Sequence, residues 1–403
     1  MSTADAPSLP LEGVTILAVE QYGAGPFGTM LLADMGAEVL KIETPDSGGE
    51  VGRQIGPYFF GEGDSHFFQA FNRNKRSMTL NLKHPDGRAV FERLVAGADA
   101  VLDNLRGDLP EKLGLTYDDL KAVNPAIVCA HLSAYGRDGP RKGWPGYDFL
   151  MQAEAGYLSL TGEPDAPPAR FGVSIVDMMA GQLAVLGLVS ALTGARRTGR
   201  GMDVDVNLFD TALHNLTYLA AWYLNAGHRQ GREPRSAHPS LTPCQLYRTR
   251  DGWLFIMCNK EKFWPLLAEK LGHPEWIADP RLDCFKARLD HRALVTALLD
   301  EALGERDSQA WMEILGGVVP VAPVLDVCEA LDNPFVVDRG RLDDFPRAEG
   351  GDPVRMLAPP IHLGARDTPR RAAPSLGADT EAVLGAHGYS AGDIAALRAV
   401  GAI

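Results

Sequence analysis

Cysteine is scarce in this chain, and the few cysteines do not stand in any metal-binding or redox spacing. Five of them, Cys129, Cys244, Cys258, Cys284 and Cys328, are spread over 403 residues without a CxxC motif. The sequence therefore predicts neither a disulfide framework nor a metal site, and it favours a reducing compartment, the cytoplasm. The N-terminus also lacks a basic stretch followed by an apolar run, so no secretory signal is expected.

Positive charge is in short supply as well. The formal net charge is −13 at pH 7, which argues against nucleic acid as a partner because a phosphate backbone needs a basic face. A local exception is the group Arg73, Lys75, Arg76 and Lys83. This group predicts either a positive patch that holds the phosphates of a small anionic ligand or a solvated surface run.

Hydrophobic runs long enough to approach a membrane span are limited to residues 175–192. Asp177 opens this run and Gln182 interrupts it, so we expect a buried core helix and no membrane association. Hydrophobic residues make up 45% of the chain and charged residues 23%, proportions typical of a soluble globular protein. The length favours two domains.

The opening part of the chain predicts a unit of strand, helix and strand. Residues 13–18 and 38–43 read as buried strands, and a helix at 27–35 joins them, which implies a parallel sheet. Between them, the run from Gly23 to Gly28 matches G-x-G-x-x-G, and Glu43 stands where a dinucleotide fold places its ribose-binding acid. This fingerprint is weak evidence when it stands alone, so a nicotinamide-dependent oxidoreductase stays an alternative.

The alternation of strand and helix continues well beyond this unit. Further strands are expected at 78–82, 100–103, 127–133 and 202–206, and further helices at 86–96, 117–123 and 208–224. We therefore expect a Rossmann-like α/β domain over residues 1–224. A polar linker and a hairpin signal at Arg250-Asp251-Gly252 then predict a small α+β domain over residues 225–330, and the tail, 331–403, is expected to return to the large domain.

Asp177 has two interpretations from the residues alone. A carboxylate at the start of a helix is favoured by free backbone N–H groups and by the helix dipole, which predicts an ionised N-cap. Alternatively, Asp177 is a nucleophile, because carboxylates attack acyl carbonyls and form covalent intermediates.

Several short motifs, in this order, resemble the class III CoA-transferase family, which includes formyl-CoA transferase and the carnitine and bile-acid CoA-transferases. The resemblance covers nearly the whole chain. The matching pieces are Ala24-Gly25-Pro26, the run from Asn72 to Ser77, the turn at Asn104, Tyr135-Gly136 with Gly139-Pro140, Gly146-Tyr147-Asp148, the Asp177 helix, Thr198-Gly199-Arg200-Gly201 and Pro374-Ser375-Leu376-Gly377.

The resemblance implies roles for particular residues. Asp177 takes the place of the family's nucleophile, with Tyr147 and Asp148 as active-site neighbours. CoA would act as a substrate rather than a tightly bound cofactor, and an interlocked homodimer is expected. The expected CoA contacts are Gln21, Tyr22, Gly23, Ala24, Leu80, Lys83, Asn104, Leu105 and Lys112. An arginine that grips CoA in formyl-CoA transferase is Thr44 here, so Arg73, Lys75 or Arg106 is expected to replace it.

By the same resemblance, the reaction passes CoA from an acyl-CoA to a carboxylic acid through mixed anhydrides and an aspartyl-CoA thioester. The segment 237–243 replaces the family's glycine-repeat lid and resembles the branch that acts on dicarboxylates, which favours succinyl-CoA or another dicarboxylyl-CoA as donor. His238 in this segment is either a substrate contact or a structural histidine.

Two further alternatives stay open. An α-methylacyl-CoA racemase shares the fold and uses a histidine with an aspartate as acid and base, but Tyr147 stands where that histidine belongs, and its reference pKa near ~10 makes it a poor proton relay. The other alternative is a CoA-binding protein without catalytic activity.

Overall fold

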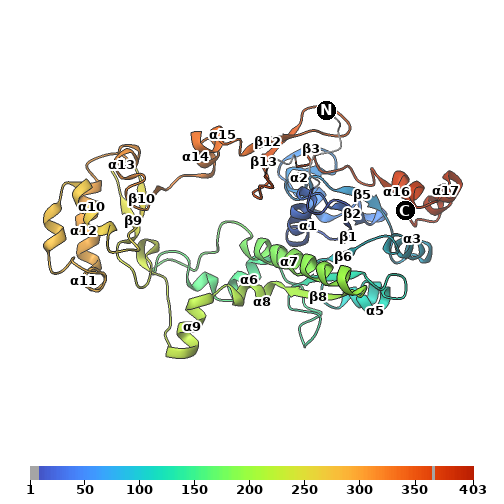
Figure 1. Ribbon diagram of the computed structural model, residues 1–403, viewed down its shortest axis with the longest axis horizontal. Coiled ribbons are helices and arrows are strands. Elements are labelled where there is room, and N and C mark those ends of the chain that lie inside the picture. The colour runs from blue at the N-terminus through green and yellow to red at the C-terminus, as the bar shows by residue number, and fades with distance from the viewer. Residues whose placement is uncertain (1–8, 365–367) are drawn as a thin grey trace. The chain divides into compact units, whose positions relative to one another are not determined.

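The computed structural model describes residues 9–364 and 368–403. Its largest element is a six-stranded sheet in the order β5-β2-β1-β6-β7-β8, and every neighbouring pair in it is parallel. The strands are β1 (Thr15–Val19), β2 (Glu38–Glu43), β5 (Arg76–Thr79), β6 (Ala100–Asp103), β7 (Val128–Ser133) and β8 (Met202–Asn207). The expected α/β fold with a parallel sheet is confirmed (Figure 1).

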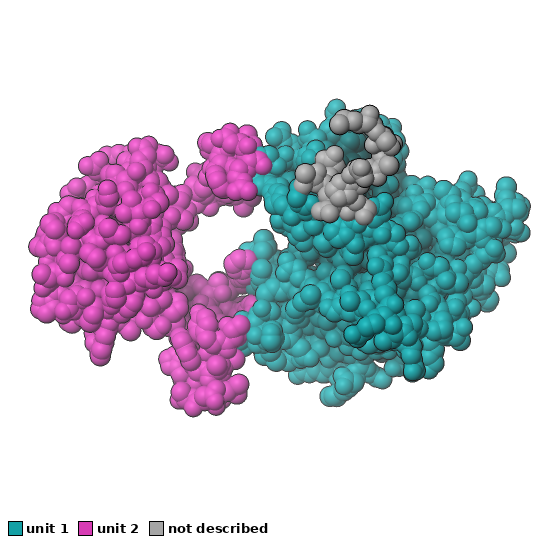
Figure 2. Space-filling view, viewed as in Figure 1, with its two compact units in different colours: residues 1–155, 172–216, 340–403 teal, residues 156–171, 217–339 magenta. Residues whose placement is uncertain are grey.

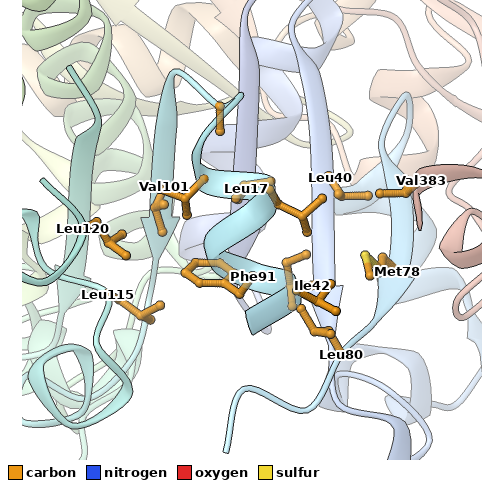
Figure 3. Close-up of a cluster of buried hydrophobic side chains, with 14 of the residues drawn as sticks. Leu17, Leu40, Ile42, Met78, Leu80, Phe91, Val101, Leu115, Leu120 and Val383 are labelled. Carbon is orange, nitrogen blue, oxygen red and sulfur yellow. The ribbon is translucent and has the colours of Figure 1, made fainter. Parts of the chain in front are cut away.

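Helices cover both faces of this sheet. On one face, α1 (Ala24–Asp34) and α7 (Ile175–Thr198) pack Leu32 and Leu188 against strand residues such as Ile16. On the other face, α3 (Pro85–Val95) places Phe91 among Leu17 and other apolar side chains of the sheet (Figure 3). This second face is completed by α5 (Tyr117–Leu120), α16 (Thr380–Ala386) and α17 (Ala391–Ala399). Burial on both faces explains why β1 and β6 are apolar over most of their length, with Thr15 and Asp103 at their ends.

The glycines of the G-x-G-x-x-G run serve close packing inside the protein. A Cβ atom on Gly28 would lie 2.6 Å from the carbonyl oxygen of Gly181, and one on Gly181 would lie 2.4 Å from the carbonyl oxygen of Ala24, so α1 and α7 touch backbone to backbone. A Cβ atom on Gly25 would lie 2.9 Å from the side chain of Asn104. The dinucleotide interpretation of these glycines is therefore replaced by a packing role that presses the start of α7 against the start of α1.

Helix α7 carries the long hydrophobic run. It is the one helix in the described part of the chain that is long and apolar enough to cross a membrane by length and composition, and 44% of its most hydrophobic window is buried. Its buried residues include Val176, Ala184 and Leu188, and they belong to the core on the α1 side of the sheet. The packed face of α7 is therefore part of the core.

The chain divides into two compact units, which Figure 2 colours separately. Unit 1 comprises residues 1–155, 172–216 and 340–403, and unit 2 comprises 156–171 and 217–339. Besides the sheet and its covering helices, unit 1 contains β3 (Phe59–Gly61), β4 (Asp64–Ser65), α2 (His66–Asn72), α4 (Leu109–Leu113), α6 (Asp148–Glu154), α8 (Leu208–His214), β12 (Leu342–Phe345) and β13 (Val354–Leu357).

Unit 2 is a smaller α+β body with its own core. Its antiparallel sheet has the order β11-β10-β9 and packs with helices around Tyr247, Trp264 and Trp311. The elements are α9 (Thr217–Ala226), β9 (Cys244–Arg248), β10 (Trp253–Met257), α10 (Phe263–Leu271), α11 (Phe285–Asp290), α12 (Arg292–Leu303), α13 (Ser308–Leu315), β11 (Val321–Pro323), α14 (Val327–Leu331) and α15 (Pro334–Asp338).

The boundaries of these units differ from the expected 1–224, 225–330 and 331–403. The helix expected over 208–224 is two helices, α8 and α9, because the backbone turns at Thr217, whose φ is 47°. Unit 2 starts at that turn and also includes 156–171, while the tail joins unit 1 only from residue 340. There Asp379 accepts hydrogen bonds from the Arg76 side chain at 3.0 Å and the Ser77 N–H at 2.9 Å.

A buried histidine ties three neighbouring strands together. His131 on β7 pairs through Nδ1 with Asp103 on β6 at 2.5 Å and through Nε2 with Asp203 on β8 at 3.1 Å. Burial by itself would lower the pKa of His131, but the two carboxylates raise that pKa to about 9. The histidine is therefore charged at neutral pH and stabilises the sheet through two ion pairs.

We expect this triad to make stability fall at alkaline pH. Because folding raises the pKa of His131, its contribution is complete below the ordinary pKa near 6.5 and is lost as pH rises through about 9. His131→Gln should lower the free energy of unfolding by about 3 kcal/mol at neutral pH, since the buried Asp103 carboxylate loses its charged partner and the partly exposed Asp203 keeps only Arg137 as a charged partner. Urea unfolding across this range would test it, and a deficit that stays constant up to about pH 10 would contradict it.

Candidate active site

Asp177 stands in the first turn of α7 and is held there by a second carboxylate. The N-cap of α7 is Ser174, so the interpretation of Asp177 as the N-cap is wrong. Its backbone N–H donates to Oδ2 of Asp148 at 2.9 Å, and Oδ1 of Asp148 accepts from the Gln152 side chain at 2.6 Å. Asp148 is 3% exposed, with both oxygens engaged. The structure thus makes Asp148 a support for Asp177, at the first residue of α6.

The side chain of Asp177 is an unusually weak acid for an aspartate. Its partial burial raises its pKa to about 7, and repulsion from the neighbouring Asp148 carboxylate adds to that rise. The expectation that the helix dipole keeps this group ionised is therefore corrected, because burial and Asp148 act against the charge. A carboxylate with a raised pKa is a better nucleophile than an ordinary one once it is deprotonated, and a pKa near 7 leaves much of it deprotonated at neutral pH.

The carboxylate of Asp177 faces the start of α1. A Cβ atom on Gly23 would lie 3.1 Å from its Oδ2 atom, so the backbone of Gly23 borders the carboxylate directly. Gly23 is the N-cap of α1 and supplies no side-chain cap. The first N–H groups of a helix have no partner within the helix and favour negative charge. This helix start can therefore stabilise an oxyanion that develops beside Asp177.

We expect Gly23→Ala to lower kcat by about 10-fold while leaving the protein folded, because even a small displacement of a catalytic group lowers the reaction rate steeply. The φ of Gly23 is −104°, which alanine adopts readily, so the added methyl group acts by displacing Asp177. Steady-state kinetics would measure the effect. Gly194→Ala on α7, the helix that carries Asp177, is the control, because its Cβ atom meets open space. Equal rates for the two variants would contradict this contact.

A cavity of about 140 Å³ lies in front of Asp177. It opens at the carboxyl ends of β1, β6 and β7, where ligands bind in parallel sheets. The rings of Tyr22 and Tyr147 meet edge to face across it, with centroids 5.7 Å apart, and Tyr147 is 56% exposed. The predicted site residues that line this cavity are Gln21, Tyr22, Ala24, Asn104, Leu105, Arg106, Tyr147 and Asp177.

A larger cavity of about 490 Å³ lies at the carboxyl ends of β1, β2 and β5. It shares Gln21 and Leu105 with the cavity at Asp177, so the two are neighbours along one edge of the sheet. Leu80 and Lys83 line it, as does Thr44. Lys112 lines neither cavity, but its ammonium group and the guanidinium group of Arg106 both pair with Asp108, each at 2.5 Å.

Arg73 and Lys75 are not brought to this site, so two of the four cations of the predicted positive patch do not take part in it. Arg73 is 5% exposed and pairs with Asp34 at 2.6 Å, while Lys75 is 3% exposed and pairs with Glu20 at 2.6 Å. A buried cation needs such an internal partner. Neither side chain is therefore free to replace the arginine that is absent at Thr44.

Two roles at the site were not recognised from the sequence. Asn104 was expected to contact CoA, yet its side chain accepts from the Gln21 N–H at 2.8 Å and donates to the Gln21 carbonyl oxygen at 2.7 Å. Glu50, in a polar loop without any motif, accepts from the Tyr22 N–H at 2.9 Å. No sequence signal marks either contact, because the partners lie 83 and 28 residues apart.

His238 belongs to unit 2, whereas the other predicted site residues belong to unit 1. Its Nδ1 atom accepts from the Ser240 N–H at 3.2 Å, and its carbonyl oxygen accepts from Arg292 at 2.7 Å. Partial burial and the charge of Arg292 both lower the pKa of His238, so its ring is neutral at neutral pH.

Comparison with known proteins gives this geometry a context. The model of CoA-transferase family III matches residues 11–380. An acetyl-CoA:oxalate CoA-transferase of Acetobacter aceti is 34% identical over 93% of this chain and 95% of that protein. A succinate–glutarate CoA-transferase of Agrobacterium fabrum is 33% identical over the same shares of the two chains. A succinyl-CoA–D-citramalate CoA-transferase of Chloroflexus aurantiacus is 34% identical over 83% of each chain.

Solved structures agree with these relatives. A CAIB/BAIF family protein from Brucella suis superposes with a TM-score of 0.82 at 32% identity, covering 94% of this chain and 100% of that one. A Mycobacterium tuberculosis protein reaches a TM-score of 0.83 at 28% identity, covering 94% and 99%. The family match over nearly the whole chain, with relatives named for CoA transfer, shows what kind of enzyme this is. The chain belongs to the class III CoA-transferase family.

Proposed function

We propose that this enzyme moves CoA from succinyl-CoA, or another dicarboxylyl-CoA, to a carboxylic acid with Asp177 as nucleophile. The observation that carries the proposal is the position of the Asp177 carboxylate at a cavity, against Gly23 and the start of α1, with a pKa of about 7. The relatives named for succinate, glutarate and citramalate support a dicarboxylate substrate. The relative named for acetyl-CoA and oxalate is equally similar and also names a dicarboxylate, but it has a different donor, so the exchange assay includes acetyl-CoA.

The chemistry proceeds in four substitutions at carbonyl carbons. The Asp177 carboxylate attacks the thioester carbonyl, the C–S bond breaks, and CoA leaves as a thiolate with a mixed anhydride behind it. The thiolate then attacks the aspartyl carbonyl and releases the donor acid, which forms aspartyl-CoA. The acceptor carboxylate displaces CoA from Asp177, and the returning thiolate takes the acceptor acyl group, which restores the Asp177 carboxylate. One thioester replaces another, so the exchange needs no energy input.

Each of these steps passes through a tetrahedral oxyanion beside Asp177. The N–H groups of Gly23, Ala24 and Gly25 are the donors that would stabilise it, because the Gly23 backbone borders the carboxylate and the first N–H groups of a helix have no partner within that helix. The Tyr147 ring and the exposed rim of the same cavity would contact the acyl group.

CoA would extend from this cavity into the larger one. The shared lining residues Gln21 and Leu105 connect the two spaces, and Lys83 offers an ammonium group for the phosphates. Arg106 and Lys112 lie on the Asp108 turn nearby and add positive charge. We expect no tightly bound cofactor, since CoA enters and leaves as substrate.

Lys83→Ala should raise KM for the acyl-CoA by about 10-fold and leave kcat nearly unchanged, because the phosphate contact is made equally in the ground and transition states. The increase should shrink at high ionic strength as screening weakens the contact in the wild type. Initial rates at two salt concentrations would measure both effects. Lys121→Ala, which removes an exposed lysine paired with Asp118, is the control. An unchanged KM would remove Lys83 from the CoA site.

The proposed working form is a homodimer in the cytoplasm. Helix α9 has no buried residue, and it exposes Tyr218, Tyr223 and Leu224 at 48%, 55% and 77%. Aromatic surface of this kind marks protein interfaces. Light scattering with size-exclusion chromatography would show twice the chain mass, and a monomer would count against the dimer.

The proposed reaction is tested by an exchange assay. Succinyl-CoA is offered to a pool of carboxylic acids, and the CoA esters are separated by chromatography and identified by mass. New CoA esters would establish the donor and name the acceptor. If succinyl-CoA survives while acetyl-CoA is consumed, the proposed donor class is wrong. Survival of every donor with every acid would refute the proposed CoA transfer.

A further inference from the structure

The backbone next to the candidate nucleophile adopts a conformation that its residue type disfavours. Tyr22 has a φ of 61°, in the left-handed region. For a residue with a Cβ atom this conformation costs roughly 1–2 kcal/mol, so it persists only where neighbouring groups hold it. Tyr22 directly precedes Gly23, whose backbone borders the Asp177 carboxylate.

Two side chains from distant parts of the chain hold this segment. Asn104 binds the N–H and the carbonyl oxygen of Gln21. Glu50 binds the next N–H along the chain, that of Tyr22, through Oε2 at 2.9 Å. Successive peptide groups before Gly23 are therefore fixed from outside the segment, and the contact at the strained residue itself belongs to Glu50.

Glu50 is built into the structure rather than free on a loop. It is 7% exposed, and its Oε2 atom also accepts from the Gly52 N–H at 3.1 Å. Its own N–H donates to Oε2 of Glu43 at 3.1 Å. Its Oε1 atom lies 3.6 Å from the Lys41 ammonium group and has no hydrogen-bond partner among the described residues. Glu50 lines the larger cavity and Tyr22 the smaller one, so the contact lies where the two cavities adjoin.

We propose that Glu50 is a positioning residue for CoA transfer: its carboxylate holds the left-handed backbone at Tyr22 and thereby fixes Gly23 and the start of α1 against Asp177. This role rests on the proposed function, because Asp177 is the reacting group that Glu50 serves. Glu50 itself acts through Tyr22 and does not touch the reacting atoms.

A second account of Glu50 is that it serves only as a counterion for Lys41, and two conservative variants separate the accounts. Glu50→Gln keeps the length and an oxygen that can accept from the Tyr22 N–H, but it loses the charge beside Lys41. Glu50→Asp keeps the charge, but it is one methylene shorter and does not reach that N–H. Positioning requires that Gln retain activity and Asp lose it, whereas a counterion role requires the reverse.

We expect Glu50→Asp to lower kcat by about 20-fold with KM for the acyl-CoA changed less than about 3-fold, as for a misplaced catalytic group. Glu50→Gln should stay within about 3-fold of the wild type in both constants. Ser65→Ala is the matched control: it removes the 2.6 Å hydrogen bond from Ser65 to Gly52, which loosens the same segment without touching Tyr22. Loss of kcat in Ser65→Ala equal to that in Glu50→Asp would overturn the proposal.

A second background tests the strain directly. Glycine adopts positive φ freely, so in a Tyr22→Gly enzyme the Glu50→Asp change should lower kcat by less than about 3-fold. An undiminished loss in this background would overturn the proposal.

A readout that needs no turnover separates this inference from the proposed function. In a crystal structure of Glu50→Asp, Tyr22 should leave the left-handed region and Gly23 should move away from Asp177, while in Glu50→Gln both should stay. Retention of the Tyr22 conformation in Glu50→Asp would refute the positioning role even in an active enzyme. Failure of every exchange assay, with the conformational change still observed, would refute the proposed function. The conclusion that Glu50 holds the backbone at Tyr22 would then still stand.

Discussion

Asp177→Asn is expected to lower CoA transfer by at least about 10⁴-fold, the scale of losses seen when an enzyme's nucleophile is removed. Asparagine keeps the size of the side chain, and the backbone N–H of residue 177 still donates to Asp148. The side-chain amide, however, cannot attack the thioester. Steady-state exchange with the donor and acceptor identified by the assay would measure the loss. The wild type incubated with donor alone should also carry CoA on the peptide that contains Asp177, detectable by mass, and the variant should not.

Substitution of a nearby acid tests whether the loss is specific to Asp177. Asp138→Asn changes an acidic residue of the neighbouring loop that does not line the Asp177 cavity, and it should retain most of the activity. An Asp177→Asn enzyme with more than about a tenth of the wild-type rate would remove the nucleophile assignment.

The Asp177→Asn variant should be more stable than the wild type at neutral and alkaline pH. Folding raises the pKa of Asp177 from an ordinary 3.8 to about 7, so the ionised carboxylate is disfavoured in the folded state. A shift of this size corresponds to at most about 4 kcal/mol, and because the side chain is only partly buried we expect about 2 kcal/mol above pH 7. The gain should vanish below about pH 4, where the group is protonated in both states. Thermal unfolding of both proteins at these pH values would show it.

The sequence was a sound guide to the sheet because the signals there are local. Residues 38–43 match β2 from end to end, since Gly36 and Pro45 bound a short segment that contains the strand-forming residues Val39, Leu40 and Ile42. The helix carrying Asp177 begins where its apolar run begins, at residue 175, but it continues past the end of that run at 192 to Thr198. The break between α8 and α9 was missed because it depends on the φ of Thr217, which no periodicity records.

Charges were harder to place than apolar residues. Whether Arg73 and Lys75 form a surface patch depends on Asp34 and Glu20, which approach them from 39 and 55 residues away. The expectation that the helix start keeps Asp177 ionised failed for a similar reason, because the burial and the Asp148 charge that raise its pKa come from the folded arrangement. Tertiary partners thus decided the electrostatics, while local pattern decided the elements.

The charge of Asp148 should shift the pH dependence of the reaction to higher pH. In the wild type, kcat/KM should rise with pH through about 7, since the free enzyme must carry an ionised Asp177. Asp148→Asn keeps an oxygen that can accept from the Asp177 N–H but removes the charge repulsion. The rising limb of the kcat/KM profile should therefore move to lower pH by about one unit. Burial, the larger cause, still acts in the variant, so the limb should stay above the ordinary aspartate pKa.

Asp148→Ala separates the charge from the hydrogen bond. It removes the acceptor at 2.9 Å from the Asp177 N–H as well as the charge, so the first turn of α7 loses its support. We expect kcat to fall by about 100-fold, as for a displaced nucleophile, in addition to the shift of the limb. Profiles of kcat/KM against pH for both variants would measure these effects. If both variants kept the wild-type limb, the charge of Asp148 would not act on Asp177, and the acidity of the nucleophile would have to come from burial alone.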